Sequence, residues 1–247
     1  MNCYINCKNL NKPKPIMKIK RATTMAVCLC LFVCFCQNES GNEKTQTLTR
    51  IHREVDFHFD KDRVGAVPDG WRIGKTGRGT QGKWLVLRDT TSRNVDYVFA
   101  QISKRSLGNH FHLAIMDNYI VDNVEIKVNL KMLDGQEEQS GGVVWRYQNP
   151  DNYYACLADP LKERLRLYKV VNGEKRLLQS VWAPKVEARE WEEMDIEHVH
   201  DRIECRFDDK TYIELRDSTF TTGKTGLCTK ADAVVYFDDM EIEREKE

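Results

Sequence analysis

The sequence predicts an all-β protein built as an antiparallel sandwich of two sheets. Short segments alternate apolar and polar residues with a period of two, as expected for strands that are buried on one face. These segments recur roughly every ten residues and are separated by Gly, Asp and Asn, a spacing typical of sandwiches. With 247 residues, the chain is long enough for one such domain and short additional segments.

The clearest strands lie in residues 140–171, which we expect to form a meander of three antiparallel strands. Alternation in the first strand puts Val143, Trp145 and Tyr147 on one face and Val144 and Arg146 on the other. An Asn-Pro-Asp turn follows, because proline lacks a donor for the ladder and pushes the preceding residue out of the helical region. Asn172-Gly173 ends the third strand, since both residues tolerate the positive φ of a tight hairpin.

The remaining strands are expected on both sides of this meander, in a domain that spans residues 55–247. Alternation predicts strands in VDFHF, KWLVLRD, YVFAQIS and VEIKVNLKML before it, and in KRLLQSVW, WEEMDIEHV, RIECRF, TYIEL, GKTGLCTK and AVVYFDDMEI after it. A turn-rich crossover ends in Trp71. Residues 104–123 fit either two short strands or a loop with one turn of helix.

Residues 1–36 have the layout of an N-terminal extension followed by a secretory signal peptide, with Met17 as the better start. A basic segment precedes the apolar run 25–35, which is shorter than the about 20 apolar residues that cross a bilayer. Residues 37–54 read as a polar linker. We therefore expect an extracytoplasmic protein, whether secreted, periplasmic or attached to the outer surface.

Cys36 resembles the lipidation site of bacterial lipoproteins, because a polar segment follows it. A lipobox prefers a small residue before the cysteine, whereas Phe35 stands there. Lipidation of Cys36 and plain cleavage of the signal peptide both stay open.

Charge restricts the expected partners. Lys and Arg together number 38, as do Asp and Glu, so the net charge is zero. Without a basic stripe or a polybasic run, neither nucleic acid nor an anionic membrane surface is expected as the main partner. We expect a monomer that meets a membrane only through a lipid anchor.

Three cysteines remain in the domain, Cys156, Cys205 and Cys228, all in strand-like segments. Buried free thiols and one disulfide with a leftover thiol are both compatible with an exported protein. The spacing offers no CxxC pair for zinc.

Three segments resemble the laminin-G-like and 3-keto-disaccharide-hydrolase-like domains of the concanavalin A-like lectin/glucanase superfamily: GGVVWRYQNPDNYY, LRLYKVVNGEK and GKTGLCTKADAVVYFDDMEI. The resemblance covers about residues 55–242 and is strongest in the last segment. It implies a two-sheet antiparallel jelly-roll sandwich with a concave and a convex face. It fixes no activity, because the superfamily contains both binding modules and hydrolases.

The segment Glu193-Met-Asp195-Ile-Glu197 is similar to the catalytic strand of family 16 glycoside hydrolases. In a strand this spacing puts three carboxylates on one face, where the two glutamates would act as nucleophile and acid/base across the roughly 5 Å gap of a retaining enzyme. The alternative is an ordinary strand, in which Met194 and Ile196 face the core and the carboxylates face solvent.

Arg146, Arg166 and Tyr168 are candidates for ligand binding on a shared polar face, and Tyr154 joins them if Tyr153 faces the core. Arginine offers paired donors and tyrosine an aromatic surface, which suits recognition of a sugar. The alternative is a solvated face covered by arginine stems. The expected function is binding of carbohydrate or another extracellular ligand. Alternatives are a glycoside hydrolase acting on a glycan or keto-disaccharide, and a surface module without a small ligand.

The resemblance also implies a structural calcium ion as the candidate cofactor. Asp238 stands where related enzymes carry a calcium ligand in the closing strand, and Asp56 or Asp60 on the opening strand would add a second oxygen. Calcium takes six to eight oxygens, so surface carboxylates are the alternative. Two His-x-His pairs would place two rings on one strand face without a third metal ligand: His110 with His112, and His198 with His200.

Overall fold

The computed structural model describes residues 53–89, 97–104, 110–183 and 186–244. The expectations for the signal peptide, the start at Met17, Cys36 and nearly all of the polar linker fall on residues 1–52, outside these ranges. Within them, no helix has the length and apolar character needed to cross a membrane.

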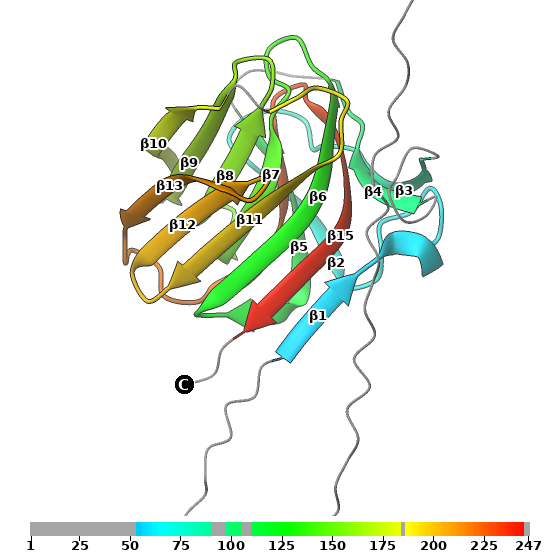
Figure 1. Ribbon diagram of the computed structural model, residues 1–247. Helices are drawn as coiled ribbons and strands as arrows, with labels where there is room; N and C mark the ends of the chain where they lie inside the picture. The colour runs from blue at the N-terminus through cyan, green and yellow to red at the C-terminus, as the bar shows by residue number, and fades with distance from the viewer. Residues whose placement is uncertain (1–52, 90–96, 105–109, 184–185, 245–247) are drawn as a thin grey trace, which may run out of the picture. The chain divides into compact units, whose positions relative to one another are not determined.

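The described residues form the predicted all-β sandwich of two antiparallel sheets (Figure 1). Sheet A has the order β13-β12-β11-β6-β15-β4-β3, with β1 paired to β15. Its strands are β1 (Arg53–Phe57), β3 (Trp84–Arg88), β4 (Tyr97–Gln101), β6 (Val124–Asp134), β11 (Glu192–Val199), β12 (Arg202–Phe207), β13 (Lys210–Arg216) and β15 (Val234–Arg244).

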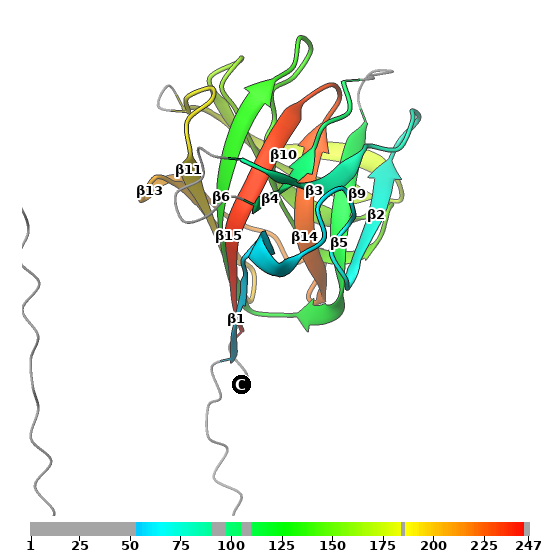
Figure 2. The ribbon, with the colours of Figure 1, turned by 90° about the vertical axis from the view of Figure 1, so that its right-hand side faces the viewer.

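Sheet B packs against sheet A and has the order β10-β9-β8-β7-β14-β5-β2; Figure 2 shows β14, β5 and β2 of sheet B beside β11 and β6 of sheet A. Its strands are β2 (Trp71–Thr76), β5 (Phe111–Val121), β7 (Gly141–Asn149), β8 (Asn152–Asp159), β9 (Arg164–Val171), β10 (Glu174–Trp182) and β14 (Gly223–Lys230). The predicted meander is therefore β7-β8-β9, and Asn172 and Gly173 have the expected positive φ, 53° and 80°.

Two segments differ from their predictions. The strand expected to run through Phe59 ends at Phe57, and Phe59–Lys61 form a short 3-10 turn. The described part of the unclear region, residues 110–123, contains one long strand, β5, rather than two short strands or a helical turn. Its first six residues are all buried, because β5 lies inside sheet B with apolar contacts on both faces, and this removes the alternation that marks a strand in a sequence.

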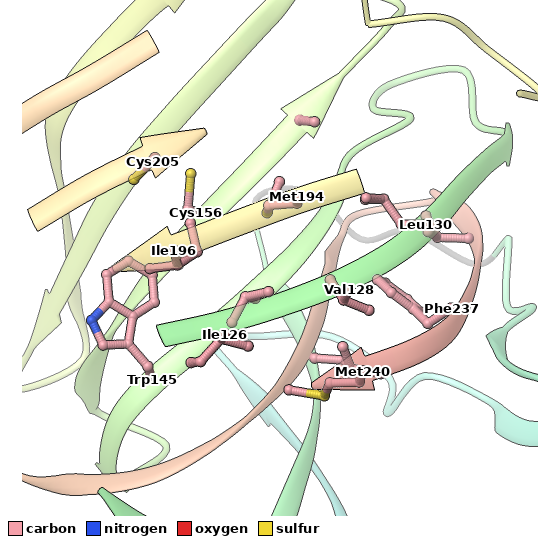
Figure 3. Close-up of a cluster of buried hydrophobic side chains, with 14 of the residues drawn as sticks. Ile126, Val128, Leu130, Trp145, Cys156, Met194, Ile196, Cys205, Phe237 and Met240 are labelled. Carbon is pink, nitrogen blue, oxygen red and sulfur yellow. The ribbon is translucent and has the colours of Figure 1, made fainter. Parts of the chain in front are cut away.

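The main core lies between the two sheets. Apolar side chains of β6 and β11 meet Trp145 and Cys156 of sheet B there (Figure 3). A second apolar cluster covers the other face of sheet B, which we call its outer face: Phe111, Leu113, Ile115, Val144, Tyr153, Ala155, Leu157, Val170 and Cys228. Sheet B is thus apolar on both faces, whereas the outer face of sheet A is charged.

Candidate functional site

The Glu-x-Asp-x-Glu segment lies in β11 and presents its three carboxylates on the outer face of sheet A. Met194 and Ile196 point into the core (Figure 3), as the ordinary-strand alternative requires. Four steps along the strand separate Glu193 from Glu197 by roughly 13 Å. The two side chains would have to lean toward each other to approach the separation that a retaining mechanism needs.

Arginines of β12 hold these carboxylates in place. Arg206 donates to Asp195 at 2.6 Å and to Glu197 at 2.9 Å. Arg202 donates to Glu197 at 2.9 Å. Burial raises the pKa of both Glu193 and Asp195. Two arginines bind Glu197, so the carboxylates of β11 form an ion-pair network. They are not arranged as a free nucleophile opposite a proton donor.

A row of six glutamates crosses the outer face of sheet A, one on each of six neighbouring strands. They face one another directly in the strand registers, in the order Glu214, Glu204, Glu197, Glu125, Glu243 and Glu54. Like charges directly opposite destabilise a sheet. A cavity of about 180 Å³ lies against the middle of this glutamate row, and its described lining contains no aromatic side chain.

Arg146 does not lie on the polar face expected for it, because its exposed fraction is 1%. Its φ of 46° and a bulge after Trp145 turn the side chain toward the space between the sheets. The guanidinium donates to the backbone carbonyls of Asp122, His200 and Phe220 at 3.0, 3.1 and 2.8 Å. Arg146 therefore ties together three turns at one end of the sandwich, beside a cavity of about 360 Å³.

Tyr154 is also buried between the sheets. Its ring stacks on Trp145 with the centroids 5.6 Å apart, and its hydroxyl donates to Asp217 at 2.5 Å. The indole N–H of Trp145 donates to Nδ1 of His198 at 3.0 Å. Burial, reinforced by the charge of Arg146, lowers the pKa of His198 to about 3. These side chains form a neutral-histidine network in the core.

The aspartates expected to bind calcium form no ligand set in the described part of the chain, although, besides burial, the charge of Asp60 contributes to the raised pKa of Asp238. Asp238 is buried, accepts the N–H of Asp239 at 2.9 Å, and has a pKa raised to about 7 by burial. Asp56 faces Glu241 in the β1–β15 register, and Asp60 lies in the 3-10 turn. Across the described ranges, no three His, Cys, Asp or Glu side chains are arranged to hold a metal ion. The residues present do not fit a calcium site.

His110 and His112 do lie together, with their ring centroids 4.4 Å apart in a buried position. Nε2 of His112 lies 2.9 Å from the carbonyl oxygen of Ala231. Burial, and then the neighbouring His110, lowers the pKa of His112 to about 4. Burial therefore keeps His112 neutral at the start of β5.

Cys156, Cys205 and Cys228 are free and buried, which agrees with the first of the two cysteine alternatives. Cys156 of β8 and Cys205 of β12 lie in the main core (Figure 3). Cys228 belongs to the apolar cluster on the outer face of sheet B.

Arg166 and Tyr168 share the outer face of sheet B, while their neighbours Leu165 and Leu167 enter the main core. Tyr168 contacts Phe111 edge-on at 5.6 Å. The structure thus separates the four predicted ligand-binding residues into two pairs. Arg146 and Tyr154 lie between the sheets, Arg146 because of the bulge after Trp145 and Tyr154 because Tyr153 faces outward instead.

Two buried carboxyl groups lie beside Arg166. Asp159 and Glu138 hydrogen-bond to each other, and burial together with this bond raises the pKa of Asp159 to about 6. Burial opposes ionisation of Glu138, but hydrogen bonds from Asp159, Lys162 and Lys230 lower its pKa well below the usual range. Arg166 lies 3.2 Å from Glu138 and 3.4 Å from Asp159. The two carboxyl groups therefore share a proton only below about pH 6, and they lie at a cationic end of the sheet.

The other end of this face contains a cavity of about 290 Å³, which we call the Tyr147 pocket. Asp117 lies between two cations there. Arg72 donates to its Oδ2 at 3.0 and 3.2 Å, and Lys224 donates to its Oδ1 at 2.8 Å. Tyr147 and the turn after it, including Asn149, complete the lining. An aromatic ring therefore stands beside an ion-paired polar cluster.

The sequence did not single out the residues of the Tyr147 pocket. Arg72, Asp117 and Lys224 come from β2, β5 and β14, which become neighbours only through non-sequential pairing. Tyr147 was expected on the same face as Trp145, and this is wrong because the bulge after Trp145 shifts Tyr147 to the outer cluster. The Asn-Pro-Asp turn was the one local signal that a surface loop follows Tyr147.

Comparison with known proteins supports the fold. The domain family described as "3-keto-alpha-glucoside-1,2-lyase-like domain" matches residues 59–243. No match was found among the curated proteins searched.

Solved structures give the same architecture. The carbohydrate binding module CBM66 from Bacillus subtilis has a TM-score of 0.55 at 20% identity, covering 72% of this chain and 96% of its own. The cellulose-induced protein Cip1 has a TM-score of 0.53 at 11% identity, covering 76% and 96%. A protein of unknown function from Shewanella oneidensis MR-1 has a TM-score of 0.50 at 12% identity, covering 80% and 87%. At these identities the likeness establishes the concanavalin A-like fold alone.

Proposed function

The chain belongs to the 3-keto-alpha-glucoside-1,2-lyase-like domain family, and we propose that it binds carbohydrate in the Tyr147 pocket. The observation that carries this proposal is the pairing of an aromatic ring with polar groups held in fixed positions. Tyr147 packs against Tyr153 with the centroids 5.8 Å apart, and Asp117 is fixed by two cations. An aromatic face packs on the apolar side of a sugar ring, and a few fixed polar groups set its orientation.

The proposal is tested by titrating a panel of oligosaccharides into the protein and measuring the heat of binding. We expect Tyr147→Ala to weaken binding by at least about tenfold, as for an aromatic contact at the centre of an interface. Trp182→Ala is the matched control, because Trp182 is an exposed aromatic residue of β10 outside the pocket. Unchanged affinity in Tyr147→Ala would contradict the proposal.

A second candidate function is cleavage of a glycosidic bond in a glycan or keto-disaccharide, favoured by the Glu138–Asp159 pair. A proton donor with a pKa of about 6 suits general acid–base catalysis near neutral pH. Two hydrogen-bonded carboxyl groups are closer than the about 5 Å of retaining glycosidases. The pair would therefore transfer a proton rather than supply a nucleophile and a separate acid. Loss of turnover in Asp159→Asn, but not in Glu193→Gln, is the expected result.

We also propose that the protein acts outside the cytoplasm, on the basis of the signal-peptide pattern that ends at Cys36. Mass spectrometry of the mature N-terminus in a bacterial host tests this. A residue near 37 at the N-terminus would support cleavage, and a diacylglyceryl adduct on Cys36 would support lipidation. An intact N-terminus would contradict export.

A further inference from the structure

The zero net charge of the chain hides a difference between the two outer faces of the sandwich. The outer face of sheet A carries the glutamate row, of which Arg202 and Arg206 neutralise only part. Cations predominate at both ends of the outer face of sheet B. A ligand of sheet B therefore meets a positive field, which focuses anions toward it.

The Tyr147 pocket itself has one positive charge in excess. Arg72 and Lys224 share the single carboxylate of Asp117. The Arg72 side chain is 73% exposed despite this pairing, so its remaining donors are open to a ligand. A guanidinium offers several donors in a planar fork, which suits a carboxylate or a sulfate.

The end of the outer face of sheet B far from the Tyr147 pocket also has an excess of positive charge. Lys162, Arg166 and Lys230 all contact Glu138, so three cations surround the two carboxyl groups of Glu138 and Asp159. Lys175 adds a fourth cation. Its Nζ lies 4.9 Å from the centre of the Phe111 ring, and within the described part of the chain this amine has no hydrogen-bond partner.

We propose that the ligand of the Tyr147 pocket is an anionic glycan, one whose sugars carry carboxylate or sulfate groups. The inference rests on the proposed carbohydrate-binding function and names the class of sugar. Arg72 and Lys224 bind the anionic group while Tyr147 packs on the sugar ring. Lys224 and Lys230 stand at opposite ends of β14, about 20 Å apart at the rise of a strand. An extended oligosaccharide along β14 would therefore meet cations at both ends.

The test compares three probes by titration calorimetry on the full chain: oligogalacturonides, their uncharged methyl esters, and a sulfated galacto-oligosaccharide. We expect the charged probes to bind at least about tenfold more tightly than the esters at low ionic strength, with a gap that narrows as salt screens the charges. Whether the carboxylated or the sulfated probe binds more tightly identifies the anionic group.

Lys224→Met should lower affinity for the charged probes by about tenfold, as for loss of one charge-assisted hydrogen bond, and lower affinity for the esters by a smaller factor, because Asp117 loses one of the two cations that fix it. Lys210→Met, on the edge strand β13 of sheet A, is the matched control and should change nothing. Equal affinity for acids and esters, with Tyr147→Ala still weakening binding at least about tenfold, would overturn this inference and leave the proposed function standing. Failure of every oligosaccharide to bind would refute both.

Discussion

Arg146→Met tests whether the buried guanidinium is a structural tie between three turns. Asp122 lies between β5 and β6, His200 between β11 and β12, and Phe220 between β13 and β14. Each offers a backbone carbonyl to Arg146 within 3.1 Å. Methionine has similar length but no donor, so the substitution removes the hydrogen bonds and largely keeps the packing.

The expected cost follows from the acceptors that lose a donor. Each buried carbonyl left without a partner costs about 1–3 kcal/mol. Water from the adjacent cavity can reach part of this region, so the lower end of that range applies and the three sum to about 3 kcal/mol. The variant also avoids the free-energy cost of burying a cation, because desolvation disfavours the charged guanidinium and lowers its pKa. This gain reduces the net loss in the free energy of unfolding to about 2–3 kcal/mol.

Equilibrium unfolding in urea, followed by tryptophan fluorescence, measures this loss. With a slope of about 2–3 kcal/mol per molar urea, the midpoint should fall by about 1 M. Arg176→Met is the control, because Arg176 is an exposed residue whose only described pair is with Glu174 at 3.4 Å, and such pairs contribute about 0–1 kcal/mol. A midpoint in Arg146→Met that matches this control would refute the structural role.

Three further results are expected. Glu243→Lys should raise stability by about 0.5–1 kcal/mol at low salt, because lysine would face Glu125 and Glu54 instead of a like charge; a gain of the same size at high salt would contradict this reason. Unfolded His198 takes up a proton near pH 6.5 and the folded residue only near pH 3, so its contribution to stability is lost as the pH falls. The advantage of the wild type over His198→Gln in urea should therefore shrink by about 1.4 kcal/mol per pH unit between about pH 6 and pH 4, and a constant advantage would refute the shift. Glu193→Gln should leave any turnover of glycans unchanged, and a loss would restore the family 16 mechanism.

The sequence predicted the strands well wherever one face of a strand is polar. In β11, Met194 and Ile196 alternate with carboxylates, and both the strand and its orientation are confirmed. In β5 the apolar cluster on the outer face removes the alternation, so the strand could not be recognised by its period. The fold class could be predicted because most strands of sheet A alternate apolar and polar residues, and because Asn172-Gly173 marks a tight hairpin.

The candidate site was predicted less completely. The face of the sheet on which a side chain lies depends on local backbone geometry, and an alternation of period two does not reveal a bulge. Arg146 has a positive φ without being glycine, and the bulge beside it reverses the faces of Arg146 and Tyr147 relative to simple alternation. Such conformations are uncommon for residues other than glycine. Arg166 and Tyr168, which lie in a regular strand, were placed on the same face correctly.

The net charge of the chain likewise does not show how charges are distributed over the two faces of the sandwich. The six members of the glutamate row are scattered between positions 54 and 243, and only strand pairing brings them into line. The balanced total argues against polyanions as a class, but the faces have opposite character, so the argument must be made face by face. Nucleic acid binding relies on cations that neutralise many successive phosphates. The outer face of sheet B offers two separate cationic ends, and the Tyr147 pocket has one charge in excess. This spacing suits a sugar chain with occasional anionic groups better than a continuous phosphate backbone.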